Sequence, residues 1–153
     1  MYKRQILGNE QGRGLYKKKL IRLVEQYRLT NQIKFMDQCK DMALAYQVSD
    51  IVISPSIEPE AFGRVAVEAQ SMEKLIIASN IGGSNETIIN EKTGFLFEAG
   101  DANSLSKKII QAITMDESSL KLMGKEGRKN VIKKFNVEKM CFSTYSEYKR
   151  LVN

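Results

Sequence analysis

A short β-branched run that leads into a proline-broken turn, at residues 50–63, constrains the fold more than any other stretch. Residues 51–53 read Ile-Val-Ile, which predicts a strand buried on both faces of a parallel sheet. Pro55 and Pro59 are the only two prolines, and each keeps the residue before it out of the helical region. Residues 64–70 read as a helix, so the stretch predicts a strand, a turn and a helix.

The start of this helix is a candidate anion site. Gly63 permits close backbone approach, and the first N–H groups of a helix have no acceptor within it and carry partial positive charge. Val65, Ala69 and Met72 share one face by their spacing, and we expect that face to pack on the core. Glu68 then lies at the edge of the face, where a carboxylate needs a partner.

Glu60 precedes the same helix, so its carboxylate and that of Glu68 can converge on one crevice although they are eight positions apart. The simpler interpretation makes Glu60 a loop charge and Glu68 half of a surface salt bridge. The spacing alone leaves both interpretations open.

The rest of the chain alternates strands with helices. Strands are predicted at residues 2–7, 33–36, 75–79 and 95–97, and helices at 16–27, 41–46, 85–89, from Asp101 or Asn103 to 113, at 120–135 and at 137–151. This order predicts an α/β fold with a single Rossmann-like parallel sheet and helices on both faces. A second glycine-rich turn, Gly82–Gly83, opens on the same sheet edge as the first, where ligands of such sheets bind.

Composition narrows the function classes. A length of 153 residues, 42% hydrophobic, fits one globular domain, and the net charge of +6 suits an anionic ligand, an acidic partner, an anionic membrane surface or ordinary lysine-rich helix faces. No nucleic-acid signature, P-loop or dinucleotide fingerprint occurs, so nucleic-acid binding, ATPase and dehydrogenase functions are not expected. The absence of histidine excludes a histidine base or histidine metal site. Cys39 and Cys141 are expected to be buried thiols in a reducing compartment.

Residues 60–68, Glu-Ala-Phe-Gly-Arg-Val-Ala-Val-Glu, resemble the Glu-x7-Glu signature of the retaining GT-B glycosyltransferases of group 1, similar to family 4. That family includes sucrose synthases, lipopolysaccharide glucosyl- and mannosyltransferases and phosphatidylinositol mannosyltransferases. The flanking segments 49–56, 76–88 and 93–97 also follow the family's order, and the resemblance extends from about residue 6 to the C-terminus.

The resemblance implies the C-terminal, nucleotide-sugar-binding half of a GT-B fold. By position, Glu68 would accept hydrogen bonds from the ribose hydroxyls of a UDP- or GDP-sugar, and Glu60, the candidate catalytic residue, would bind sugar hydroxyls. The backbone at Phe62 and Gly63 would hold sugar or phosphate oxygens. The other implied donor-binding residues are Ala61, Arg64, Gly82, Gly83 and, near the base, Cys39. The chemistry implied is retaining transfer without cofactor or metal, with the diphosphate leaving under electrostatic stabilisation.

By the family's pattern, residues 1–153 are expected to be this one domain, incomplete at its N-terminus and without the acceptor-binding domain or the segment that gives an Arg and a Lys to the diphosphate. Asp37, Glu73 and Leu75 stand where the family has Gly, Gly and Pro. The implied setting is the cytoplasm or the inner face of the membrane, in cell-envelope polysaccharide, lipopolysaccharide or glycolipid synthesis. Expected partners are a nucleoside-diphosphate sugar, a separate acceptor-domain chain or a second copy, and a peripheral membrane contact.

Two other functions remain open. The chain could be a non-catalytic nucleotide-sugar-binding subunit or remnant of a split enzyme, or a glycosidase whose paired carboxylates lie roughly 5–9.5 Å apart. The glycosidase is the least favoured, since it needs no anion-binding helix terminus. Helix 137–151 bears on the first alternative, because in the family the C-terminal helix crosses to the other domain. Its apolar face, with Val137, Cys141, Tyr145 and Tyr148, is expected to fold back on this domain or to stay partly bare.

Overall fold

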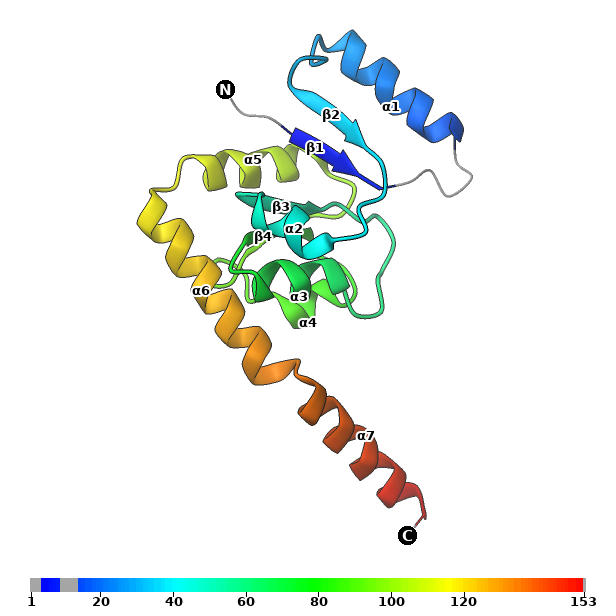
Figure 1. Ribbon diagram of the computed structural model, residues 1–153, viewed down its shortest axis with the longest axis vertical. Coiled ribbons are helices and arrows are strands. Elements are labelled where there is room, and N and C mark those ends of the chain that lie inside the picture. Colours follow the sequence, from blue (N-terminus) through cyan, green and yellow to red (C-terminus); the bar gives the residue numbers. More distant parts are fainter. Residues whose placement is uncertain (1–3, 9–13, 153) are drawn as a thin grey trace. The chain divides into compact units, whose positions relative to one another are not determined.

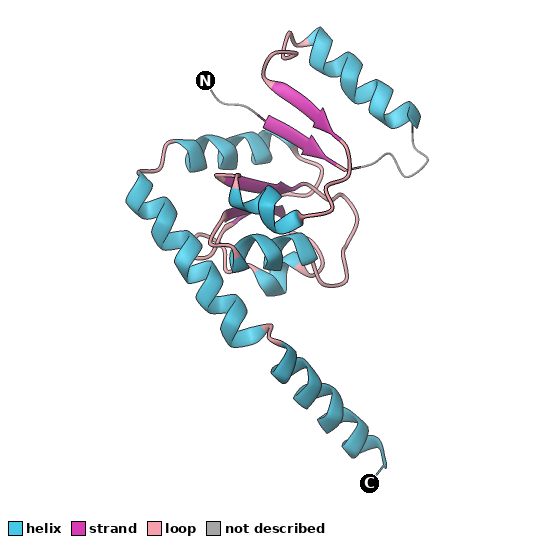
Figure 2. Cartoon of the chain, viewed as in Figure 1, coloured by secondary structure: helices cyan, strands magenta, loops and turns pink. Residues whose placement is uncertain are grey.

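The computed structural model describes residues 4–8 and 14–152, which divide into two compact units, Met1–Met42 and Ala43–Asn153. Each unit is an α/β assembly in which every strand pair is parallel (Figures 1 and 2). The predicted α/β class with parallel strands is therefore confirmed.

The first unit holds a two-stranded sheet and one helix. Strand β1 (Arg4–Leu7) pairs in parallel with β2 (Ile33–Met36), in a register that sets Arg4 opposite Ile33 and Leu7 opposite Met36. Between them runs the amphipathic helix α1 (Gly14–Gln26), whose Val24 is buried. The strand predicted at residues 33–36 and the helix predicted at 16–27 are thus observed, and so is the strand predicted at 2–7 as far as it is described, since residues 2 and 3 lie outside the described residues.

The second unit is built on a three-stranded sheet of order β3-β4-β5. Its elements in chain order are α2 (Met42–Gln47), β3 (Ile51–Ser54), α3 (Arg64–Ser71), β4 (Leu75–Ser79), α4 (Ser84–Thr87), β5 (Phe95–Phe97), α5 (Ala102–Ile113), α6 (Glu117–Lys134) and α7 (Val137–Val152). The central strand β4 is buried at every position, as its uninterrupted apolar pattern predicts. Asp101 caps α5 by accepting hydrogen bonds from the N–H groups of Asn103 and Ser104, which decides between the two predicted caps.

Helices cover both faces of this sheet. Leu75 and Ile77 of β4 join Phe95, Phe97 and Ala112 in a core beneath α5 and the start of α6. Because side chains alternate along a strand, Ile76 and Ala78 point to the opposite face, on which α3 and α4 lie (Figure 1).

The single sheet expected from the sequence is replaced by two, one in each unit. In the second unit β3 is an edge strand and is only partly buried, so the prediction that residues 51–53 are buried on both faces is also wrong. The reason is that a β-branched run specifies an extended backbone, whereas pairing and burial depend on distant strands.

The buried face of α3 also differs from the one expected. Its buried residues are Ala66, Ala69 and Gln70, so the face is rotated away from Val65 and Met72, which are only partly buried. The cause is α6, whose Gly124 lies so close that a Cβ there would sit 2.1 Å from the carbonyl oxygen of Glu73. A tight helix contact selects small residues on α3, which apolar spacing does not reveal.

Helix α7 has no buried residue, so the expected alternative of a bare apolar face is the one observed. Its exposed large hydrophobic residues are Val137, Met140, Phe142, Tyr145, Tyr148, Leu151 and Val152. Cys141 on the same helix is exposed, which corrects the expectation of a buried thiol there, while Cys39 is partly buried. Among the described residues, no helix is both long and apolar enough to cross a bilayer.

Candidate functional site

The site is built around the turn that joins β3 to α3. Gly63 is the N-cap of α3 and adopts the left-handed conformation, with φ of 74°, which glycine tolerates best. Its carbonyl oxygen accepts hydrogen bonds from the N–H groups of Ala66, at 3.0 Å, and Val67, at 3.4 Å. Within the described structure the N–H groups of Gly63, Arg64 and Val65 have no acceptor. The predicted set of unpaired donors at the start of α3 is therefore present, and its position suits an anion.

The second glycine-rich turn packs directly against the first. The N–H group of Gly83 donates to the carbonyl oxygen of Glu60 at 2.8 Å. A Cβ on Gly82 would lie 2.6 Å from that oxygen, and one on Gly83 would lie 2.4 Å from the carbonyl carbon of Phe62. Because the N–H group of Gly83 donates to Glu60, the observed role of this turn is to hold residues 59–63 in place. The expected contact of both glycines with the donor stays a prediction.

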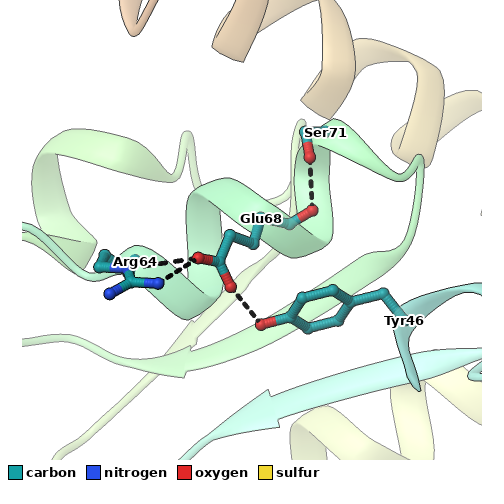
Figure 3. A network of polar contacts seen from close by, with 4 residues as sticks. All are labelled: Tyr46, Arg64, Glu68 and Ser71. Carbon is teal, nitrogen blue, oxygen red and sulfur yellow. Dashed lines mark hydrogen bonds and ion pairs between the residues drawn. The ribbon is translucent and has the colours of Figure 1, made fainter. Parts of the chain in front are cut away.

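Glu68 has two partners, one buried and one exposed. The Tyr46 hydroxyl donates to Oε2 at 2.8 Å, and the Arg64 guanidinium donates to Oε1 from Nη2 at 3.0 Å and from Nε at 3.3 Å (Figure 3). The Ser71 hydroxyl donates to the backbone carbonyl oxygen of Glu68. The Glu68 side chain stays 35% exposed. Oε1 already accepts two hydrogen bonds from Arg64, whereas Oε2 accepts only the one from Tyr46, so Oε2 can still accept a hydrogen bond from a ligand.

Tyr46 is the strongest anchor of that carboxylate. It is 5% exposed, and burial, followed by the hydrogen bond and charge of Glu68, raises the pKa of its phenol far above the ordinary value. The expected partner of Glu68 is thus found, and the surface salt bridge of the simpler interpretation is present as well. The sequence reasoning missed Tyr46, because its only local signal is membership of a short helix 22 positions before Glu68.

Glu60 is held inside the turn. The Ser56 hydroxyl donates to Oε1 of its half-buried carboxylate. Its backbone oxygen accepts from Gly83, so both ends of the residue are fixed. In the described structure Glu60 and Glu68 share no hydrogen-bond partner, and their convergence on one ligand stays a prediction.

Phe62 ties the turn to the junction between α6 and α7. Its ring meets that of Phe135 edge to face, with centroids 5.6 Å apart and an interplanar angle of 73°. Phe135 is the C-cap of α6, one residue before Asn136, whose side chain accepts from the N–H group of Lys139 in α7. The outer side of the turn is therefore packed against a residue more than seventy positions later in the sequence.

A buried polar network supports the turn from beneath. The side-chain amides of Gln70 and Asn130 each donate to the carbonyl oxygen of Thr87 at 3.0 Å. The Thr87 hydroxyl donates to the carbonyl oxygen of Gly83 at 2.9 Å. Helices α3 and α6 are thereby linked through α4 to the glycine-rich turn. Sequence reasoning missed all three residues, which are separated by 17 and 43 positions.

The remaining predicted residues occupy different places. Ala61 and Arg64 are exposed on the turn and the first turn of α3. Cys39 belongs to the first unit, where its Sγ contacts the carbonyl oxygen of Asp41 at 3.0 Å, so its place beside a donor base stays a prediction. Glu73 has φ of 57°, so this departure from glycine is strained, whereas Asp37 is not among the described positive-φ residues. Across residues 4–8 and 14–152, no cluster of acidic residues and cysteines could hold a metal ion.

Comparison with known proteins gives consistent matches. The family model for glycosyl transferases group 1 matches residues 5–130. The capsular polysaccharide biosynthesis glycosyltransferase CapM of Staphylococcus aureus is 35% identical over 111 residues, which are 67% of this chain and 29% of CapM. The chain thus spans about a third of that relative's length.

Solved structures agree with this match. A glycosyltransferase from Rickettsia africae superposes with a TM-score of 0.93 and 34% identity over 100% of this chain and 41% of its own. The Anabaena protein HepE in complex with UDP gives a TM-score of 0.88 and 25% identity over 96% of this chain and 41% of its own. With a family model that matches most of its length, the chain belongs to the glycosyl transferases of group 1.

Proposed function

We propose that the second unit binds a nucleoside-diphosphate sugar at the turn 59–63 and the start of α3. The observation that carries the proposal is the group of unpaired N–H donors at Gly63, Arg64 and Val65, set one helical turn from the anchored carboxylate of Glu68. In this proposal the N–H donors bind the diphosphate and the Glu68 carboxylate accepts hydrogen bonds from ligand hydroxyls, with both groups on helix α3 or at its start. The UDP and UDP-glucose complexes of the Anabaena protein support this class of ligand.

Within this site we assign Glu68 to the ribose hydroxyls and Glu60 to the sugar. Glu68 is fixed by Tyr46 yet partly exposed, which suits an acceptor for ligand hydroxyls. Glu60 precedes the donors in the turn, where Ser56 and Gly83 hold it. No protein metal ligand enters the assignment, and the leaving diphosphate is stabilised by backbone donors.

For the reaction we propose glycosyl transfer with retained anomeric configuration, in cell-envelope polysaccharide, lipopolysaccharide or glycolipid synthesis, at the cytoplasmic side of a membrane. Retention rests on the resemblance of residues 60–68 alone, and the pathway on that resemblance and on relatives such as CapM. Transfer requires donor and acceptor held together in a closed cleft, and such orientation supplies about 7–11 kcal/mol of a barrier. We propose that the bare apolar face of α7 meets the acceptor-binding wall of that cleft, and that these 153 residues alone bind the donor without transferring it.

Saturation-transfer NMR on the purified chain tests the binding function. UDP-, GDP- and ADP-sugars and free oligosaccharides are compared at equal concentration. One class of nucleotide sugar is expected to give a signal from ribose and sugar protons that excess diphosphate anion weakens. A signal from oligosaccharides alone would favour a glycosidase and contradict the proposal.

Two further measurements test the reaction. In a radiolabelled-donor assay, transfer of sugar to an acceptor by this chain alone would contradict the proposal that the acceptor site lies outside these 153 residues. Sedimentation at micromolar concentration tests the docking role of α7. If the chain stays strictly monomeric when the protein part that carries the acceptor-binding wall is added, that role is contradicted.

A further inference from the structure

The outer face of α6 is strongly basic. Helix α6 has six basic and two acidic residues, a net charge of +4 out of the +6 of the whole chain. Four lysines repeat every four positions and so follow one another along the helix: Lys121, Lys125, Lys129 and Lys133. This lysine stripe is exposed along its whole length. It lies opposite the buried face made by Gly124, Gly127, Asn130 and Val131.

Two large aliphatic side chains interrupt the stripe. Leu122 is 61% exposed and lies three positions before Lys125, and Ile132 is 58% exposed and lies three positions after Lys129. Residues three apart on a helix are neighbours, so each aliphatic side chain is flanked by a lysine. A single exposed aliphatic residue is ordinary, but a pair inside a lysine row gives the face both charge and apolar area.

The carboxylates nearby pair with only two of the four lysines of the stripe. Glu117 pairs with Lys121 at 2.5 Å and Glu126 pairs with Lys129 at 2.6 Å. Both lysines and Glu117 are exposed and Glu126 is half-buried, so each pair stays in contact with water and is weak. In the part of the chain that the structure describes, Lys125 and Lys133 have no carboxylate within ion-pair distance. As far as the described residues go, two lysines of the stripe thus have no carboxylate partner, and the other two can be released at small cost.

We propose that this outer face of α6 docks on an anionic lipid bilayer, with the lysine stripe at the headgroups and Leu122 and Ile132 inserted just below them. The four lysines extend over about 18 Å of the helix, on the side opposite its buried face, so their long side chains can reach one flat surface. Aliphatic residues between lysines suit a bilayer, whose headgroups attract cations and whose acyl boundary accepts side chains. A nucleic acid would leave the two aliphatic residues unused, since phosphate contacts come from cations and base contacts favour aromatic rings. The proposal gives a surface to the membrane setting and does not depend on the donor site.

Vesicle co-sedimentation of the whole chain tests the proposal. Vesicles of phosphatidylcholine alone are compared with vesicles of phosphatidylcholine and phosphatidylglycerol in equal parts. Binding to the anionic vesicles only, weakening as salt is added, is expected. Each lysine near the surface contributes about fivefold to partitioning, so a double variant Lys125→Glu/Lys133→Glu should bind at least about 25-fold more weakly.

The matched control is Lys107→Glu/Lys139→Glu, which makes the same change in net charge at exposed lysines of α5 and α7. It should bind nearly as the parent chain does, because its lysines lie off the stripe. The variant Leu122→Ser/Ile132→Ser should lose binding while it keeps every charge. Thermal unfolding of each variant verifies that it is folded.

Three results would overturn the proposal. They are no binding to anionic vesicles, equal losses in the two charge-reversal variants, and tighter binding of an RNA oligonucleotide than of vesicles at the same salt. Because nucleotide-sugar binding is measured separately, a failure here leaves the donor site unaffected, and the converse also holds.

Discussion

The contact between the two glycine-rich turns predicts a large effect for Gly83→Ala. Gly83 has φ of −60°, so alanine brings no backbone strain, and the whole effect comes from its Cβ. That atom would sit 2.4 Å from the carbonyl carbon of Phe62, where only backbone can yield. Overpacking usually costs about 1–3 kcal/mol, and a backbone clash belongs at the upper end. We expect a loss of about 3 kcal/mol, or a melting temperature lower by roughly 6–12 °C.

The same variant should lose donor affinity beyond its loss of stability. Moving Phe62 displaces the neighbouring N–H group of Gly63 and breaks the bond from Gly83 to Glu60. The matched control is Gly124→Ala, whose Cβ would meet the carbonyl of Glu73 at the far end of α3. Thermal unfolding should show both variants destabilised, while calorimetry well below their melting temperatures should show weaker nucleotide-sugar binding only for Gly83→Ala. Equal affinity in the two variants would refute the idea that the second turn positions the first.

Three smaller changes test other contacts. Tyr46→Phe should cost about 1.5 kcal/mol in urea unfolding, since it removes a hydrogen bond to a charged and partly exposed Glu68. Because the pKa of Tyr46 is raised on folding, its protonated phenol stabilises the folded state below pH 10, and this stabilisation is lost as the pH rises further. The parent chain should therefore lose stability above pH 10 more steeply than this variant. Glu73→Gly should stabilise by about 0.5–1 kcal/mol, because it relieves positive φ at the loss of a weak exposed ion pair, and a lowered melting temperature would contradict this. Phe135→Leu should weaken nucleotide-sugar binding about 2- to 10-fold by loosening Phe62, with Phe135→Tyr restoring it, and unchanged affinity would show that the ring pair is incidental.

Local signals predicted the elements well. The strands at residues 33–36, 75–79 and 95–97 and the helix start at residue 64 are found where the pattern placed them. Gly63 was identified at the helix start, and its left-handed conformation explains why glycine occupies that position. These features depend on neighbours in sequence, which periodicity and turn chemistry describe.

The pairing of the strands and the contacts that support the site could not be predicted in the same way. Tyr46 reaches Glu68, Asn130 reaches Thr87 and Phe135 reaches Phe62 across long stretches of chain. A single sequence contains no signal for such contacts, because each side chain alone suits an ordinary helix. The division of the strands into two sheets was missed for the same reason.

The most direct test of the donor site is calorimetric titration of the parent chain, Glu68→Gln and Glu60→Gln with the preferred nucleotide sugar and with its nucleoside diphosphate. Loss of a charge-assisted hydrogen bond costs about 1.5–3 kcal/mol, so Glu68→Gln should bind both ligands at least about tenfold more weakly. Glu60→Gln should weaken binding of the nucleotide sugar and leave that of the diphosphate nearly unchanged. Equal losses for both ligands in both variants, or no binding by the parent chain, would contradict the assignment of this turn and helix to a nucleotide-sugar donor.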